Sequence, residues 1–144
     1  SFAEASDADT TEEVLKDIME TAETEEAAEE AEEEASKPEI TIDDFDKVEL
    51  TVCEVKNCEE IKKSRSCYKL TLDDGKGERV IVSSIKSYYT PEELIGKKII
   101  VITNLKPAKH MGVQSNGMLL AASHDDNCKV LFADSSVPAG TRIH

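Results

Sequence analysis

The apolar residues of this chain change period, from a helical spacing near the N-terminus to the alternation that is typical of β-strands. Between Val14 and Ala22 they recur every three or four residues, after a Thr10–Glu13 pair with the spacing of a helix-capping box. From residue 40 onward apolar and polar positions alternate, as in strands with one face in a core. We therefore expect one short amphipathic helix ahead of a mainly β region.

The β region divides into short runs that are separated by turns. The alternation that begins at Val48 ends where Val55 breaks the parity, which indicates a β-bulge or a barrel corner. Alternation resumes at Tyr68 and stops at the glycine-containing turn 73–77. Four further runs have the length and composition of strands, at 79–85, 98–104, 117–122 and 128–133.

Residues 90–96 interrupt the strands with the signals of one compact helix. Thr90 suits the N-cap, Pro91 the first turn and Gly96 the position after the last turn. Glu93 completes a capping box with Thr90. A helix between the third and fourth strands is the arrangement of the oligonucleotide-binding (OB) fold. The expected fold is therefore mainly β, a five-stranded Greek-key OB barrel.

Charge separates the chain into two parts. The formal net charge is −14, but fifteen of the 31 acidic residues and one of the 17 basic residues precede residue 37. The remainder is neutral, with sixteen of each sign. Glutamates four apart in 25–34 repel each other on a helix by about 0.2–0.5 kcal/mol per pair. We expect residues 1–38 to form an acidic linker arm, partly helical or disordered, and residues 39–144 to fold.

The sequence contains no pattern for catalysis, metal binding or a cofactor. No CxxC pair occurs among the four cysteines, and the three histidines have no metal-ligand spacing. Asp125-Asp126 is expected to form a turn between the last two strands. Reduced, structural cysteines favour a cytoplasmic protein, and no apolar run is long enough for a membrane span. The chain begins with Ser1 rather than Met, which hints at a fragment or a processed chain.

Basic residues, in contrast, gather where loops are expected. They follow the first, third and fourth strands: Lys62, Lys63, Arg65, Lys69, Lys86, Lys106, Lys109 and His110. In an OB barrel such loops flank the ligand face, so a neutral domain can present a positive cleft to phosphates. The alternative is a set of solvated lysines scattered over a small surface. Aromatic residues are few, and Tyr68 and Phe132 are expected in the core, so a nucleic acid would be recognised by shape and backbone.

The segment 104–118 combines these basic residues with turn residues and polar ends. Asn104 and Ser115 can hydrogen-bond either a ligand or the backbone of the loop. From spacing alone, Met111 and Met118 are more often packing residues than ligand contacts.

Three motifs carry a resemblance to a known family. The stretches ITIDDFDKVELTVCEV, IVSSIKSYYTPEELIGKKIIVITN and NLKPAKHMGVQSNGMLLAA closely resemble the tRNA-binding domain at the C-terminus of bacterial methionyl-tRNA synthetases. Free-standing tRNA-binding proteins, a mammalian synthetase-complex cytokine and the export chaperone CsaA have related domains. The resemblance covers about residues 39–144.

The resemblance implies an OB barrel with extra C-terminal strands, formation of a homodimer and sequence-tolerant binding of tRNA. It also implies that the acidic arm joins the barrel to a covalently linked synthetase catalytic domain. By position, it implies that these residues line or shape the tRNA face: Ser83, Lys86, Asn104, Lys106, Lys109, Ser115 and Met118.

Two segments depart from the family pattern. Thr51-Val52-Cys53 stands where the family usually has Arg-Val-Gly, and residues 61–67 replace its His-Pro-x-Ala-Asp-Lys-Leu; Ser84 also replaces a usual Gly. Lys62, Lys63 and Arg65 supply charge by another route. The leading hypothesis is a non-catalytic tRNA-binding and dimerisation module of methionyl-tRNA synthetase. The alternatives are a CsaA-like chaperone that binds peptides and a module for oligomerisation alone.

Overall fold

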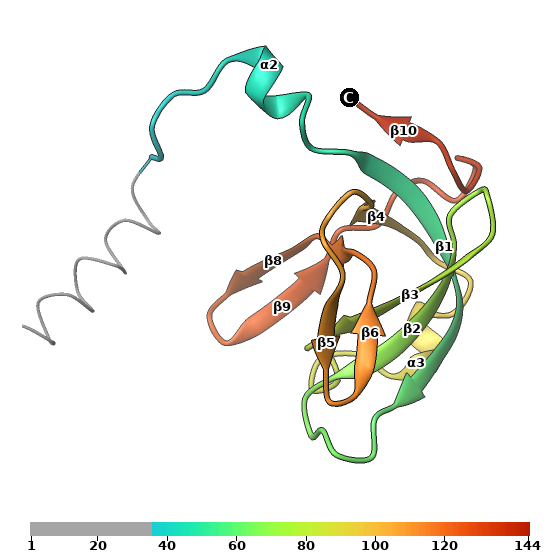
Figure 1. Cartoon of the computed structure of the whole chain (residues 1–144). Coiled ribbons are helices and arrows are strands. Elements are labelled where there is room, and N and C mark those ends of the chain that lie inside the picture. The colour runs from blue at the N-terminus through green and yellow to red at the C-terminus, as the bar shows by residue number, and fades with distance from the viewer. Residues whose placement is uncertain (1–35) are drawn as a thin grey trace, which may run out of the picture. The chain divides into compact units, whose positions relative to one another are not determined.

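The computed structural model describes residues 36–144 of the chain, so the expected N-terminal helix and most of the acidic arm lie outside the described residues. Residues 42–144 form a unit of their own (Figure 1). The elements of this unit, in chain order, are α2 (Ile42–Phe45), β1 (Leu50–Glu60), β2 (Tyr68–Asp73), β3 (Glu78–Ser83), α3 (Pro91–Leu94), β4 (Lys98–Ile102), β5 (Ala108–His110), β6 (Val113–Ser115), β7 (Met118–Leu119), β8 (Ala121–His124), β9 (Asn127–Val130) and β10 (Arg142–Ile143).

One antiparallel sheet, in the order β3-β2-β1-β4-β7, forms the body of the unit, and β10 adds to β1. The long strand β1 pairs with β4 through its first half and with β2 through its second half. The register shifts between Val55 and Asn57, which confirms the bulge expected from the break in parity. Such a bulge bends the strand, and the sheet curls accordingly (Figure 1).

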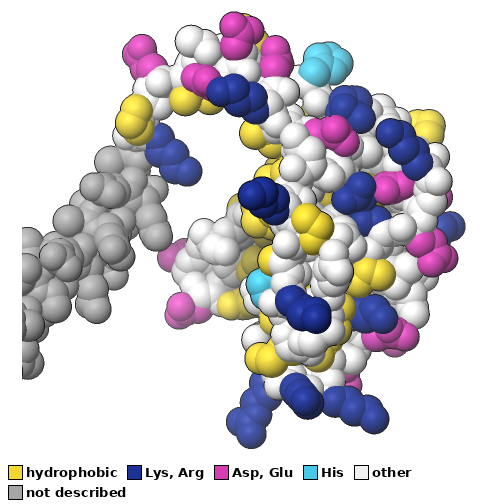
Figure 2. Space-filling model, viewed as in Figure 1, with side chains coloured by type: hydrophobic (Ala, Val, Ile, Leu, Met, Phe, Trp, Pro, Cys, Tyr) yellow, Lys and Arg dark blue, Asp and Glu magenta, His cyan; other side chains and the backbone are white. Residues whose placement is uncertain are grey.

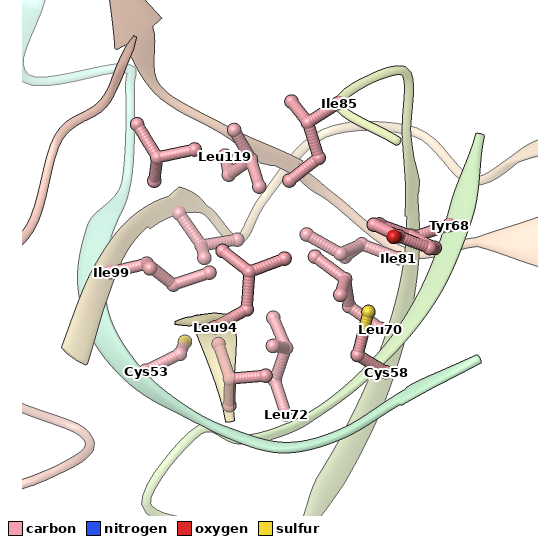
Figure 3. Packing of buried hydrophobic residues seen from close by; sticks show 13 residues of the cluster. Cys53, Cys58, Tyr68, Leu70, Leu72, Ile81, Ile85, Leu94, Ile99 and Leu119 are labelled. Carbon is pink, nitrogen blue, oxygen red and sulfur yellow. The ribbon is translucent and has the colours of Figure 1, made fainter. Parts of the chain in front are cut away.

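Helix α3 follows β3 and precedes β4, as the OB fold requires. Thr90 and Glu93 form the expected capping box, and Pro91 opens the helix. Leu94 is fully buried and points into the centre of the core between Leu72 and Ile99 (Figure 3). The mainly β, OB-like fold predicted from the sequence is therefore confirmed.

The core is lined by the curled sheet and holds two of the four cysteines. Cys53 and Cys58 are buried, and none of the cysteines is in a disulfide bond. Tyr68 is also buried, as expected, and its hydroxyl donates to the carbonyl oxygen of Tyr89 at 2.8 Å. The prediction for Phe132 is wrong, because this ring is 43% exposed. It forms a T-shaped pair with the ring of Tyr89.

The C-terminal third adds short strands to the five of the expected barrel. The segment expected as a loop at 104–118 contains the β5–β6 hairpin. The run 117–122 is split between β7, which pairs with β4, and β8, which pairs with β9. Asp125 and Asp126 form the expected turn between β8 and β9, and both have positive φ. Within residues 36–144, no helix is long and apolar enough to cross a membrane.

Candidate functional site

A groove with a volume of about 490 Å³ opens where the end of β3 faces the chain that follows β4. Its lining comes from the end of β3, the 105–110 segment, β7, β8 and Cys128 of β9. We call this cavity the groove. Four of the predicted site residues line it, namely Ser83, Lys106, Ser115 and Met118. His110 and Ser84 line it as well.

The β5–β6 hairpin forms one wall of the groove and carries basic residues into solvent. Lys106 and Lys109 are exposed, and Lys109 pairs with Gln114 across the hairpin. The hairpin turns at Met111 and Gly112, which both have positive φ. Lys and Arg side chains lie over this hairpin and over the connection from β1 to β2 (Figure 2). The groove is thus lined by one lysine, Lys106, beside apolar residues such as Leu105 and Met118, and Lys109 lies next to it on β5.

Ser115 closes the barrel beside the groove. Its buried hydroxyl accepts a hydrogen bond from the Val82 N–H at 2.9 Å and donates to the Gly117 carbonyl at 3.1 Å. Gly117 has φ +135°, and a Cβ there would lie 2.7 Å from the Ile102 carbonyl oxygen. The Ser115 side chain bonds to the backbone of β3 and of the loop at Gly117, and the residue also lines the groove.

Asn104 also bonds to backbone. Its amide oxygen accepts from the Glu49 N–H at 2.9 Å, and its amide nitrogen donates to the Lys47 carbonyl at 2.7 Å. The side chain therefore ties the end of β4 to the segment that enters β1. It does not line the groove.

The connection between β1 and β2 displays three of the predicted cations. Ile61 and Ser64 are buried, and the Ser64 hydroxyl accepts hydrogen bonds from the backbone N–H groups of residues 66 and 67. These two anchors leave Lys62, Lys63 and Arg65 exposed on the outside of the turn. The segment that departs from the family pattern is therefore an ordered loop that presents positive charge, although it does not line the groove.

Lys69 and Lys86 are the predicted cations that carboxylates already hold. Lys69 lies 3.7 Å from Glu59, and Lys86 lies 3.4 Å from Glu60. Both acids are the last two residues of strand β1, just before the connection to β2. Exposed pairs of this kind contribute little to stability, but they lower the charge that the two lysines offer to a ligand.

A second cavity, of about 410 Å³, shares no lining residue with the groove. We call it the arginine cavity, after Arg79 and Arg142 in its wall. The Arg79 guanidinium donates to Asp74, and Arg142 lies 3.5 Å from Glu49. Thr51 lines this cavity rather than the groove. Thr51 stands where the family pattern has an arginine, so the positive charge of that arginine is missing from the arginine cavity.

A chain of hydroxyl groups accounts for the buried threonines of the arginine cavity. Thr103 donates to the Glu49 carboxylate at 2.7 Å, and the Thr51 and Thr103 hydroxyls lie 2.8 Å apart. Sequence reasoning missed Arg79 as a structural residue. The signal was present, because Arg79 opens the otherwise apolar run of β3, where an isolated cation needs buried partners.

The cysteines differ in their availability for reaction. Burial, with Asp74 nearby, raises the pKa of the Cys53 thiol to about 11, and burial, with Glu92 nearby, raises that of Cys58 to about 11. Cys67 and Cys128 are partly exposed. Among residues 36–144, no group of three or more His, Cys, Asp and Glu side chains is placed to hold a metal ion.

Comparison with known proteins identifies relatives for this sequence and this fold. Residues 50–142 match the family described as "Putative tRNA binding domain". The methionine–tRNA ligase of Bacillus subtilis is 53% identical over 106 residues, which are 74% of this chain and 16% of that enzyme. That of Halalkalibacterium halodurans is 44% identical over 137 residues, which are 94% of this chain and 21% of the enzyme. The chain thus spans about a fifth or less of the length of these relatives.

Solved structures of related proteins have the same fold as this chain. A protein related to methionyl-tRNA synthetase from Pyrococcus horikoshii superposes with a TM-score of 0.72 at 39% identity, over 75% of this chain and 100% of that one. The CsaA chaperone of Bacillus anthracis superposes with a TM-score of 0.67 at 26% identity, over 74% of this chain and 100% of that one. These matches confirm the resemblance noted in the sequence, and the chain belongs to the family of tRNA-binding domains that methionyl-tRNA synthetases contain.

Proposed function

We propose that this chain holds tRNA against the groove and the exposed lysines Lys106 and Lys109, as a non-catalytic module of a methionyl-tRNA synthetase. One observation carries the assignment of the site: exposed Lys106 lines the groove, and exposed Lys109 lies close by on β5, between two residues that line it. Phosphate contacts supply most of the affinity of a protein for nucleic acid. An ordered hairpin holds its lysines ready for such contacts at a low entropic cost.

The lining of the groove favours recognition by backbone and shape. No lining residue is Phe, Tyr or Trp, and His110 is the one ring in the lining, so the groove has few of the stacking platforms of single-strand binders, each of which contributes about 1–3 kcal/mol per base. Ser83 and Ser84 offer hydroxyl groups at the groove wall instead. Hydroxyl and amine donors suit phosphates and 2′-hydroxyls, which are the same on every tRNA.

Exposed cations of the β1–β2 connection extend this proposed surface. Lys62, Lys63 and Arg65 would meet phosphates beyond the groove, and Lys69 and Lys86 would contribute less because Glu59 and Glu60 pair with them. Met118 would form an apolar edge of the site. Asn104 and Ser115 would act through the loop backbone that they bond, rather than through the ligand.

We infer that the chain acts next to a synthetase catalytic domain in the cytoplasm. The matched region is 16% of the B. subtilis enzyme, and the acidic stretch before residue 37 has the composition of a linker. Under this proposal residues 1–38 connect the two domains and residues 39–144 bind tRNA. A genomic reading frame that extends upstream of Ser1 into a nucleotide-binding ligase domain is the expected result.

Two copies of the chain are proposed to form a homodimer. Leu131 and Phe132 follow β9 with 42% and 43% of their surfaces exposed. Neighbouring apolar side chains of this size on a surface mark a protein contact. Light scattering of the full chain would give twice the monomer mass, and Phe132→Ser would return it to the monomer. A monomeric wild-type chain at micromolar concentration would exclude this part of the proposal.

A peptide-binding function is the second candidate, because apolar residues line part of the groove and two CsaA chaperones superpose on the chain at 26% and 30% identity. It predicts that the chain protects an unfolded protein from aggregation and that tRNA does not compete. If tRNA abolishes the protection, both ligands share one site.

The proposal for tRNA is tested by binding to the full 144-residue chain. Several unrelated tRNAs should bind with affinities that agree within about threefold, and an unstructured oligonucleotide of equal charge should bind about tenfold more weakly. Lys106→Glu with Lys109→Glu should weaken the binding of all tRNAs alike, by about tenfold or more. Lys76→Glu with Lys97→Glu is the control, because it makes the same charge change at two exposed lysines outside the groove. Equal losses in both pairs would exclude the groove as the binding site.

A further inference from the structure

Arg79 lies on β3, and its side chain makes three hydrogen bonds that meet at one point of the fold. Its Nε donates to the Asp74 carboxylate at 3.1 Å. Its Nη1 donates to two backbone carbonyls, that of Thr103 at 3.1 Å and that of Asn116 at 2.7 Å. The side chain is 23% exposed, and the three acceptors come from three different segments of the chain.

The two carbonyls stand at the two ends of the segment that borders the groove. Thr103 follows the last residue of β4, and Asn116 follows the last residue of β6. Between them lie Lys106, Lys109 and the whole β5–β6 hairpin. One nitrogen therefore holds together the start and the end of the 104–115 segment. Backbone bonds tie each end to a neighbouring segment, because the Thr103 N–H donates to the Glu49 carbonyl and the Asn116 N–H donates to the Val80 carbonyl. The Arg79 guanidinium is the group that bonds to both ends at once.

Asp74 fixes the guanidinium in this position. The carboxylate accepts hydrogen bonds from the backbone N–H groups of Lys76 and Gly77 at 2.9 and 3.0 Å while its second oxygen receives Arg79. Although burial acts in the opposite direction, these hydrogen bonds and the guanidinium hold the pKa of the Asp74 carboxyl below its ordinary value. The ion pair is thus intact at neutral pH. Arg79 is aimed at the two carbonyls by a partner that is itself fixed.

Arg79 does not face the groove. It lines the arginine cavity, which has no residue in common with the groove, whereas Lys106 lines the groove. An effect of Arg79 on a ligand in the groove must therefore pass through the backbone of the 104–115 segment. A direct phosphate contact and a backbone effect make different predictions for combined substitutions.

We propose that Arg79 is a positioning residue for tRNA binding, which clamps both ends of the 104–115 segment so that its lysines stand at the groove. The inference rests on the proposal that Lys106 and Lys109 hold tRNA. Removal of the guanidinium would free two carbonyls at a strand end and let the hairpin move away from β3. The lysines would remain in the sequence but leave their place at the groove.

A double-mutant cycle on the full chain tests this directly. Lys106→Gln with Lys109→Gln should weaken tRNA binding by about tenfold in the wild-type background, because two phosphate contacts are lost. In the Arg79→Met background, the same pair should weaken binding by less than about threefold, because the clamp is already gone. Arg79→Met alone should lower the salt slope by about two although it removes one charge. Effects that multiply without coupling would overturn the proposal.

Two further variants keep the test decisive. Arg142→Met removes a cation from the same cavity without touching either carbonyl, and it should change tRNA affinity by less than about twofold. Arg79→Lys keeps the charge, but one ammonium cannot reproduce the planar guanidinium, so it should weaken binding by about threefold or more. Wild-type affinity in Arg79→Lys would also overturn the proposal, and this variant carries the test if Arg79→Met does not fold.

Hydrogen exchange separates positioning from a general loss of stability. In Arg79→Lys the amides of residues 105–115 should exchange at least about tenfold faster, while the amides of β1 and β2 keep their rates. Faster exchange throughout the sheet would mean that Arg79 only stabilises the fold. If the lysine pair has no effect even beside an intact Arg79, the proposed function fails, and the clamp is then tested by the exchange of residues 105–115 alone.

Discussion

The groove and the arginine cavity are two cavities of similar volume, about 490 and 410 Å³, that use their cations in opposite ways. At the groove, Lys106 is exposed in the segment that leads into the β5–β6 hairpin. In the arginine cavity, Arg79 is bonded to Asp74 and two carbonyls, and Arg142 lies beside Glu49, while Lys76 lines the cavity as an exposed side chain. The difference teaches that the number of basic residues around a cavity does not identify a binding site for phosphate. Two of the three Lys and Arg residues that line the arginine cavity already have an acidic partner, whereas the one lysine that lines the groove has none among residues 36–144.

Solvation explains why this difference matters. A cation that already lies against a carboxylate gains little from a phosphate, since the new ion pair replaces an old one. An exposed lysine exchanges only water and counterions, and the released counterions drive binding. The groove is therefore suited to a ligand, and the arginine cavity is suited to joining β1, β3 and the C-terminal segment.

The largest effect is expected from a change that pushes the groove wall off the barrel. Gly117→Ala should destabilise the fold by about 1–3 kcal/mol, because its Cβ would lie 2.7 Å from the Ile102 carbonyl oxygen at a positive φ. Gly112→Ala is the matched control, with a positive φ but open space around the Cβ. Urea unfolding measures both free energies. Equal losses would show that φ alone matters and that the wall does not press on β4.

The next effect separates available cations from paired ones. Lys62→Gln with Lys63→Gln should weaken tRNA binding by about threefold to tenfold, since both side chains are exposed. Lys69→Gln with Lys86→Gln should have a smaller effect, because Glu59 and Glu60 lie at 3.7 and 3.4 Å from these lysines. Fluorescence anisotropy at two salt concentrations gives both affinities. A larger loss in the second pair would reverse the ranking of the cations.

A footprint on thiols tests which cavity the ligand covers. In a Cys67→Ser chain, Cys128 should be the thiol that reacts first with a maleimide, because burial raises the pKa of Cys53 and Cys58 to about 11. Bound tRNA should slow the reaction of Cys128, which lines the groove, by about threefold or more. Ala139→Cys places a reporter in the arginine cavity, where tRNA should leave the rate unchanged. Protection at position 139 alone would move the ligand to the other cavity.

The smallest effect is a pH dependence that belongs to the arginine cavity alone. The pKa of the Asp74 carboxyl lies below the ordinary value of about 3.9. The stability that it contributes is therefore fully present above that pH and is lost as the pH falls toward the folded-state pKa. Urea midpoints between about pH 5 and pH 2.5 should fall more steeply in wild type than in Asp74→Asn. Parallel curves would mean that the Asp74–Arg79 pair adds no stability.

Much of this fold follows from local patterns in the sequence. The bulge near Val55, the turn at 73–77 and the capping box of Thr90 and Glu93 each depend on neighbouring residues, and each appears in the structure. The exposure of Phe132 could not be predicted in this way. Its apolar neighbours suggested a buried strand, but β9 ends at Val130 and Phe132 pairs with β4 through an isolated bridge to Ile99.

The sequence predicted which basic residues the candidate site contains, but not which of them line the groove or already have an acidic partner. The lysines could be read from the sequence because loops expose them. Which of them stay unpaired depends on the register of β1 with β2, which sets Glu59 opposite Lys69. The sequence does not show which group the Ser115 hydroxyl bonds. In the structure it accepts a hydrogen bond from the N–H of Val82, 33 residues earlier. Such long-range partners leave no mark in local spacing.

The salt dependence of tRNA binding compares the two cavities most directly. Two matched variants each remove two positive charges, Lys106→Gln with Lys109→Gln at the groove wall and Lys76→Gln with Arg142→Gln at the arginine cavity. If the unpaired cations of the hairpin hold tRNA, the slope of log affinity against log salt concentration falls by about two in the first variant and stays at the wild-type value in the second. An unchanged slope in the first variant, or a reduced slope in the second, would contradict the assignment of tRNA to the groove.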